Sequence, residues 1–169
     1  MTKDMLEELA DNAKTSGDAT VKNLLEETTR IDTITPDYAK IELNTSVTIQ
    51  LKRLYTTSGD SIICLIRTFS APYGESEVSL YTQDWVKTGD IDIASMAKRI
   101  PEKTEGITIQ EYEKCLSAFN PALIEACLYP NDERLMVKKN APMASKDKKV
   151  ALAKINLQRF FKWDGTSFK

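Results

Sequence analysis

Apolar and polar side chains alternate with a period of two from residue 39 to residue 53. The apolar side chains occupy odd positions, namely Ile41, Leu43, Val47, Ile49 and Leu51. This pattern predicts one long strand that buries its odd side chains and leaves its even ones in water. A strand with one wet face is typical of an antiparallel sheet, because parallel sheets are covered on both faces.

Two further strands are expected directly after this one. Residues 56–60 and 71–75 are rich in the residue types that form turns. The apolar run 61–69 between the turns predicts a central strand, and the weaker alternation of residues 77–83 predicts an edge strand. We therefore expect a three-stranded antiparallel meander.

The chain before this sheet has helical spacing. Apolar side chains recur three and four positions apart in residues 2–14, with Thr2 placed as an N-cap, and again in residues 18–29. We expect a pair of amphipathic helices with an acidic outer surface. Their apolar sides must pack on the rest of the chain or on a partner.

Two helices with clear N-terminal signals are expected after the sheet. Asp90 or Asp92 can cap a short helix that runs to about residue 99. Thr108 and Glu111 have the spacing of a capping box, which predicts a helix beginning at residue 109.

The C-terminal part of the chain is predicted to be mainly helical. Pro121 stands at the first position of a helix expected over residues 121–128, and residues 134–137 are expected to form a short strand. Ser145 is a good N-cap for a helix that continues to about residue 162. The apolar residues of this last helix cover more than one side, which predicts burial in the core or between chains.

These elements predict an α+β fold, because strands and helices are segregated along the chain rather than alternating. We expect a small antiparallel three-stranded meander flanked by an N-terminal helical pair and a C-terminal helical layer. The expected organisation is an acidic amphipathic helical arm (1–30), an α+β core (38–137), and a basic C-terminal helix and tail (145–169).

The charge of the chain is unevenly distributed. Residues 138–169 contain nine basic and two acidic side chains, a net charge of +7, so the rest carries −9 of the total of −2. Such asymmetry indicates a polyanionic partner, an anionic surface or head-to-tail contact with another copy, although a solvated basic helix face with a loose terminus would give the same pattern. The candidate binding residues are Lys146, Lys148, Lys149, Lys154, Arg159, Lys162 and Trp163.

The amino-acid composition makes most kinds of enzymatic catalysis improbable. The chain has no histidine, which is the commonest general base and metal ligand. Cys64, Cys115 and Cys127 lie far apart in apolar segments and are interpreted as core residues in a reducing compartment. Asp90 and Asp92 are better explained as helix caps than as metal ligands, and the glycines form no phosphate-binding loop. We expect no catalytic residue, no metal and no cofactor.

The sequence shows no basic and apolar leader, and its longest apolar run is too short to cross a bilayer. We expect a cytoplasmic protein, or one that resides within an intracellularly assembled particle.

Function is expected to reside in surfaces rather than in a pocket. The leading hypothesis is a non-enzymatic interaction or assembly protein, such as a structural or adaptor subunit of a larger particle, including a viral or phage particle. Its oligomer interface would use Met5, Leu6, Leu9, Val150, Leu157 and Phe161. The alternative is a protein that binds nucleic acid without sequence preference through its basic C-terminal helix.

Overall fold

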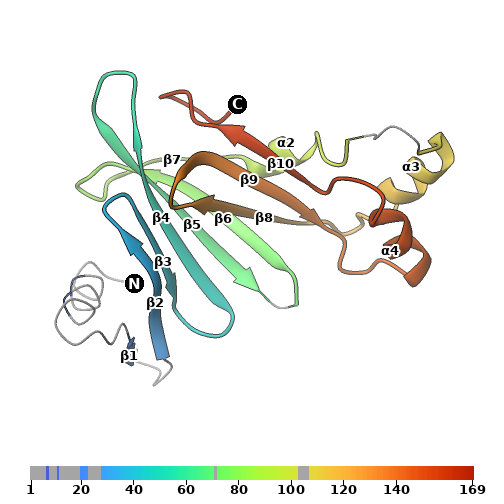
Figure 1. Cartoon of the computed structure of the whole chain (residues 1–169), viewed down its shortest axis with the longest axis horizontal. Coiled ribbons are helices and arrows are strands. Elements are labelled where there is room, and N and C mark those ends of the chain that lie inside the picture. The colour runs from blue at the N-terminus through green and yellow to red at the C-terminus, as the bar shows by residue number, and fades with distance from the viewer. Residues whose placement is uncertain (1–6, 8–10, 12–19, 23–27, 71, 103–106) are drawn as a thin grey trace.

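The described part of the chain forms two antiparallel sheets and three short helices (Figure 1). The structure is a computed structural model that describes residues 7, 11, 20–22, 28–70, 72–102 and 107–169. The large sheet contains, in spatial order, β1 (Thr20–Lys22), β2 (Thr28–Thr35), β3 (Tyr38–Glu42), β4 (Val47–Tyr55), β5 (Ser61–Ser70), β6 (Gly74–Tyr81) and β7 (Lys87–Asp90). The small sheet has the order β10 (Gln158–Lys162), β9 (Asp132–Asn140), β8 (Leu123–Tyr129). The helices are α2 (Ile93–Ala97), α3 (Ile109–Leu116) and α4 (Lys146–Leu152).

The predicted α+β fold, a three-stranded meander flanked by helical layers, is wrong. The meander continues in both directions, because β1 and β2 precede the predicted strands and β7 pairs with the predicted edge strand β6. Residues 28–35 were expected to follow or end a helix, but they are rich in β-branched Thr and Ile, which fit a pleated sheet. Of the helix expected over residues 2–14 in the predicted arm (1–30), only residues 7 and 11 are described, and both are helical. The second helix of that arm, expected over residues 18–29, is wrong where the structure describes it, because residues 20–22 form β1 and residues 28–29 begin β2.

The long strand predicted over residues 39–53 is two strands joined by a turn. The Leu43 N–H donates to Val47 O at 2.9 Å, and the Asn44 side chain accepts from Ser46 N–H at 2.9 Å. This turn preserves the alternation of the sequence, so the break is invisible in the hydrophobic pattern. Polar turn-forming residues at positions 44 to 46 explain it.

The prediction that only the odd side chains of this region are buried is also wrong. Ile41 and Ile49 are buried as expected, with 1% and 2% exposure. Gln50, Lys52 and Leu54 on the opposite face of β4 are buried as well. That opposite face is covered by the small sheet, whose strands cross those of the large sheet (Figure 1).

Two predicted C-terminal helices are replaced by strands. The helix expected over residues 121–128 is the strand β8, which forms a hairpin with β9 around Pro130 and Asn131. The helix expected over 145–162 ends after α4, and β10 then pairs with β9. Turn-forming residues and pairing with β9 override helical spacing in both places.

Several local predictions are confirmed. Asp92 caps α2 by accepting from the Ser95 N–H at 2.9 Å. Thr108 and Glu111 form the predicted capping box at the start of α3. The strands expected at residues 61–69 and 134–137 lie in β5 and β9.

The main hydrophobic core lies between the two sheets, and α2 packs against it. A second, smaller core joins α3 and α4 to the segments beside them. We call this part of the chain (107–119 and 141–157) the helical lobe. Figure 1 shows it beyond the end of the small sheet, away from the large sheet.

Polar side chains of the large sheet satisfy the backbone of β8 along the edge that β9 does not pair. Gln50 accepts from the Leu128 N–H at 3.1 Å and donates to Leu128 O at 3.3 Å. Ser76 Oγ accepts from the Ala126 N–H at 2.9 Å. A buried strand edge left without partners would be costly, so these bonds connect the two sheets and fix their relative position.

Candidate interaction face

One face of the small sheet is turned away from the main core. Its side chains alternate with those that are buried between the sheets, because successive side chains of a strand point to opposite faces. We call it the outer face; it consists of Glu125, Cys127 and Tyr129 from β8, Arg134, Met136 and Lys138 from β9, and Gln158, Phe160 and Lys162 from β10. The register places Cys127, Met136 and Phe160 in one apolar row across the three strands, in which Met136 is itself 7% exposed and Phe160 39% exposed.

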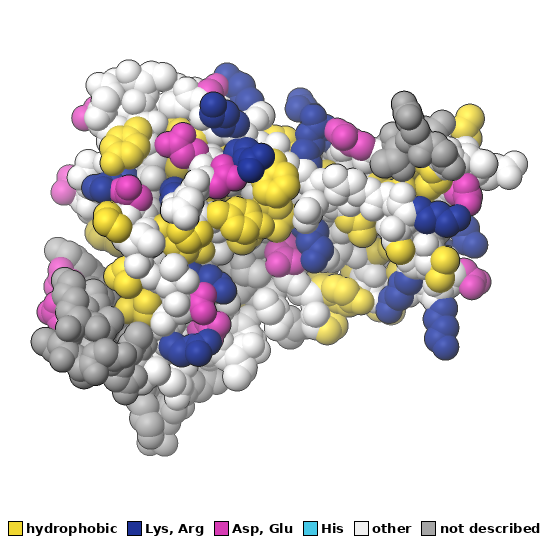
Figure 2. Space-filling model, in the orientation of Figure 1, with side chains coloured by type: hydrophobic (Ala, Val, Ile, Leu, Met, Phe, Trp, Pro, Cys, Tyr) yellow, Lys and Arg dark blue, Asp and Glu magenta, His cyan; other side chains and the backbone are white. Residues whose placement is uncertain are grey.

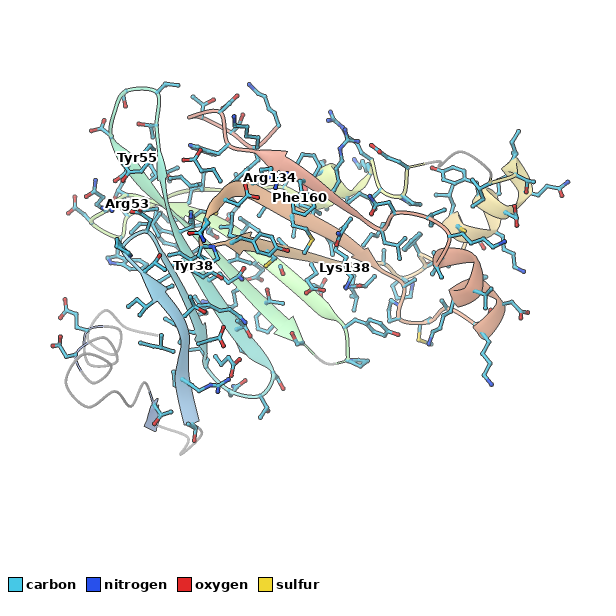
Figure 3. All side chains as sticks on the ribbon, viewed as in Figure 1. Tyr38, Arg53, Tyr55, Arg134, Lys138 and Phe160 are labelled. Atoms are coloured by element: carbon cyan, nitrogen blue, oxygen red, sulfur yellow. The ribbon has the colours of Figure 1, made fainter. Side chains whose placement is uncertain are left out.

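Two exposed aromatic side chains stand on the outer face. Tyr129 and Phe160 are each 39% exposed, and their ring centroids are 6.4 Å apart with an interplanar angle of 36°. The Arg134 guanidinium lies over the Phe160 ring, 4.8 Å from its centroid. Figure 3 shows Arg134 and Phe160 side by side on the small sheet. Aromatic and arginine side chains in such an arrangement are typical of protein contact surfaces.

Ion pairs hold the charged side chains of this face in place. Arg134 Nε donates to both carboxylate oxygens of Asp132, at 3.0 and 2.8 Å. These bonds hold the pKa of the Asp132 carboxyl below its usual range. On the other side of the apolar row, Lys138 and Glu125 lie 3.8 Å apart. The outer face therefore presents both signs of charge around an apolar centre.

A cleft of about 310 Å³ adjoins the outer face at the edge of β8. It is lined by Tyr38, Lys40, Thr48, Gln50, Thr68 and Ser70 of the large sheet and by Glu125, Ala126, Cys127, Leu128 and Tyr129. Glu125, Cys127 and Tyr129 therefore belong to both the cleft and the outer face. In Figure 2 apolar side chains gather where the two sheets meet, in the middle of this view.

The two tyrosines of the cleft are held in their neutral forms. Burial, aided by the nearby Cys127 thiol, raises the pKa of Tyr38 to about 12. Burial also raises the pKa of Tyr129. Gln50 donates to the Tyr38 hydroxyl at 3.0 Å and to Cys127 Sγ at 3.3 Å. These groups can donate and accept hydrogen bonds, but they form no acid and base pair suited to proton transfer near neutral pH.

Lys52 is the buried cation of this region. Its ammonium donates to Tyr129 O at 3.2 Å and also to Pro130 O, and it lies 5.9 Å from the centroid of the Tyr38 ring. These partners hold the hairpin between β8 and β9 against β4. Lys52 is therefore explained by the structure itself, because burying an ammonium is costly unless it is hydrogen-bonded.

The described residues contain no cluster of side chains that could bind a metal ion. Within residues 28–70, 72–102 and 107–169, and the few described before them, no three His, Cys, Asp or Glu side chains are grouped as metal ligands would be. In the same part of the chain, no helix combines the length and apolar character needed to span a membrane.

The candidate cationic residues are divided between two places. Lys146, Lys148, Lys149 and Lys154 lie in or directly after α4, whereas Arg159, Lys162 and Trp163 lie in or next to β10. Trp163 is 5% exposed, and its indole donates to Tyr55 O at 2.7 Å. Arg159 forms an ion pair with Glu102, and Lys154 with Glu111. The structure does not bring these seven side chains together as one stripe.

The candidate oligomer residues are also dispersed. Met5, Leu6 and Leu9 lie outside the described residues. Phe161 is 3% exposed in the core between the sheets, and Leu157 packs against the core of the helical lobe. Val150 is 67% exposed on α4.

The outer face was missed because residues 121–128 and 158–162 were expected to be helical. A hairpin signal was present in the sequence: Pro130, Asn131 and Asp132 separate two runs that are rich in apolar residues. Interpreted as a turn between strands rather than as a helix end, this signal places Tyr129 and Arg134 near each other.

The fold defines a class of antiparallel two-sheet proteins in which a seven-stranded meander is crossed by a three-stranded sheet. Among solved structures, "Structure of a domain of an uncharacterized protein from Porphyromonas gingivalis W83" is similar, with a TM-score of 0.73. The sequences are 15% identical, and the match covers 100% of this chain and 92% of that chain. This likeness concerns the fold alone.

The model of a protein family described as "Protein of unknown function (DUF3256)" matches residues 1–168. The chain therefore belongs to this family. None of the curated proteins compared matches the chain.

Proposed function

We propose that the protein is a non-enzymatic assembly protein that binds a second copy of itself through the outer face of the small sheet. The observation that carries this proposal is the exposed pair of Tyr129 and Phe160, with Arg134 over the Phe160 ring. Tyr, Phe, Met and Arg are enriched at protein interfaces, whereas isolated exposed apolar residues occur on any surface.

A second copy is favoured as the partner by the charge pattern. The outer face and its rim carry Glu125 and Asp132 together with Arg134 and Lys138. In a dimer with twofold symmetry the same face meets itself, so a face with both signs can place each acidic side chain opposite a basic one.

The non-enzymatic part of the proposal rests on the cleft beside this face. Burial raises the pKa of Tyr38, and partial burial raises the pKa of the more exposed Tyr129, so both keep their protons at neutral pH. Gln50 is already bonded to the backbone of β8 and to Tyr38. Such side chains favour recognition by contact over turnover of a substrate.

The test is the mass of the full chain in solution, measured by light scattering over a range of micromolar concentrations. We expect the mass to rise with concentration from 19.0 kDa toward twice that value. The double variant Tyr129→Ala/Phe160→Ala should weaken association at least about 30-fold, because central aromatic side chains dominate interface energies.

A matched control is available on the large sheet. Tyr55 and Phe69 are 50% and 42% exposed, so Tyr55→Ala/Phe69→Ala removes the same side-chain types elsewhere. This control should associate like the wild type. A mass of 19.0 kDa at every concentration, or equal effects of the two double variants, would refute the proposal.

A further inference from the structure

The helical lobe is a compact projection with its own core. Glu111 and Lys154 form an ion pair at 3.0 Å, and Lys148 donates to Ser117 O at 3.0 Å. These two contacts join opposite ends of α3 and α4, so the helices run antiparallel. Because Cys115, Leu152 and Ile155 are buried together in this core, the lobe does not depend on an additional partner for it.

The outside of the lobe carries the most exposed apolar side chains of the described residues. Met143, Val150 and Ile109 are 76%, 67% and 65% exposed, and Leu116 is 44% exposed. All four side chains are aliphatic or thioether groups rather than aromatic ones. Met143 and Val150, the two most exposed of these side chains, lie just before and on α4, and this concentration on one short segment favours an apolar partner.

Lysine side chains accompany these apolar groups. Lys114 on α3 and Lys146 and Lys149 on α4 are exposed, and among the described residues none of the three has an ion-pair partner. Figure 2 shows dark blue side chains gathered at the right-hand end, where Figure 1 places α3 and α4. Glu113 and Asp147 are also exposed on the lobe, but its lysines outnumber its acidic side chains by five to three, so the lobe carries a net positive charge beside its exposed aliphatic groups.

This combination fits a lipid surface better than the other anionic partners. Anionic headgroups attract lysines, and aliphatic side chains enter the boundary between headgroups and acyl chains. A nucleic acid would use the lysines but gain little from Val150 or Met143. A protein partner would need a shape that complements the lobe, whereas fluid lipid adapts to a projection.

We propose that the helical lobe binds the surface of an anionic lipid bilayer through α4 and the turn before it, with Met143 and Val150 inserted among the headgroups and Lys146 and Lys149 in contact with their phosphates. This site is distinct from the outer face, and the proposal is independent of self-association.

The experiment measures binding of the full chain to vesicles by co-sedimentation. One set of vesicles contains phosphatidylcholine with a fraction of phosphatidylglycerol, and the other contains phosphatidylcholine alone. We expect clear binding to the anionic vesicles and much weaker binding to the neutral ones. Because each lysine near such a surface contributes about fivefold, Lys146→Gln/Lys149→Gln should weaken binding about 25-fold.

The apolar part is tested with a pair of matched variants. Val150 and Val86 are 67% and 61% exposed, but Val86 lies between β6 and β7, outside the lobe. Val150→Asp should weaken vesicle binding at least about tenfold, whereas Val86→Asp should leave it unchanged. Met143→Ser provides a second variant at an exposed site that does not carry the fold, and it should also weaken binding.

Three results would overturn the proposal. The first is no binding to anionic vesicles by the wild-type chain. The second is equal binding by the Val150→Asp and Val86→Asp variants. The third is that binding to both duplex DNA and vesicles depends on Lys146 and Lys149 but not on Val150. The lobe would then bind polyanions in general rather than a lipid surface.

Discussion

Replacing Gln50 with leucine tests how the two sheets are joined. Gln50 is 6% exposed, and its amide bonds both the N–H and the C=O of Leu128, which is 1% exposed. Leucine has a similar size but no polar atoms. The variant therefore removes these bonds without opening a large cavity.

The expected loss follows from the groups left without partners. Each buried backbone group that loses its partner costs about 1–3 kcal/mol, and the two groups of Leu128 are affected together. The more apolar leucine side chain offsets roughly 1 kcal/mol of this cost. We therefore expect Gln50→Leu to lower the free energy of unfolding by about 1–5 kcal/mol.

The assay is equilibrium unfolding in urea, followed by the fluorescence of the two tryptophans, of which Trp163 is buried at the junction of the sheets. The control is Gln83→Leu, because Gln83 donates to Ser61 Oγ at 2.9 Å in an exposed position. This control should change the free energy of unfolding by less than about 0.5 kcal/mol. If Gln50→Leu proved as stable as Gln83→Leu, the bonds of Gln50 to β8 would not connect the sheets.

Two further predictions concern α3 and the cysteines. The Thr108 N–H bond and the Lys154 ammonium lower the pKa of Glu111 from 4.5 to about 2, so its ionised form stabilises the fold above pH 4.5 and loses this effect as the pH falls through about 2. In urea titrations, the difference in the free energy of unfolding between wild type and Glu111→Gln should therefore shrink as the pH falls from 4.5 to about 2. A difference that stays constant over this pH range would contradict the stabilising role of the ionised Glu111. Cys127 is partly exposed, whereas Cys64 and Cys115 are buried and have raised pKa values. A thiol reagent should therefore label one cysteine in the folded chain and three after unfolding. Rapid labelling of more than one cysteine in the folded chain would contradict this burial pattern.

Local signals in the sequence were enough to predict several elements. The capping box of Thr108 and Glu111 lies within four residues, so α3 could be predicted from neighbours alone. The strand β5 is an apolar run between two turns, and its partners are adjacent in the chain. Both elements are specified by contacts of short range.

The arrangement of the sheets depends on contacts that the sequence pattern does not contain. Gln50 occupies a polar position of an alternating strand, which predicts exposure to water. It is buried because Leu128, 78 residues later, supplies its hydrogen bonds. Periodicity shows which side of a strand is polar. It cannot show that the edge of a second strand, distant in the sequence, will form hydrogen bonds with those polar side chains.

The same limit applies to the outer face. Phe160 and Phe161 are neighbours in the sequence, yet β10 places Phe161 in the core and Phe160 on the surface. In a helix both would have lain on one broad apolar side, which is how they were interpreted. Only the pairing of β10 with β9 decides between these outcomes, because a one-residue shift exchanges the two faces.

The two proposed surfaces belong to different cores, and this separation has a consequence for how they act. The outer face lies over the core between the sheets, whereas Val150 lies on the helical lobe, whose core is separate. Substitutions that are distant and share no packing partners have additive effects. Phe160→Ala should therefore weaken self-association without changing the intrinsic affinity of the lobe for vesicles, and Val150→Asp should do the reverse.

A dimer would still carry two lobes, so self-association would raise the apparent vesicle affinity by placing both on one bilayer, provided that the twofold axis lets them point the same way. A loss of vesicle binding in Phe160→Ala that persists at concentrations where the wild type is monomeric would show instead that the outer face itself contacts lipid.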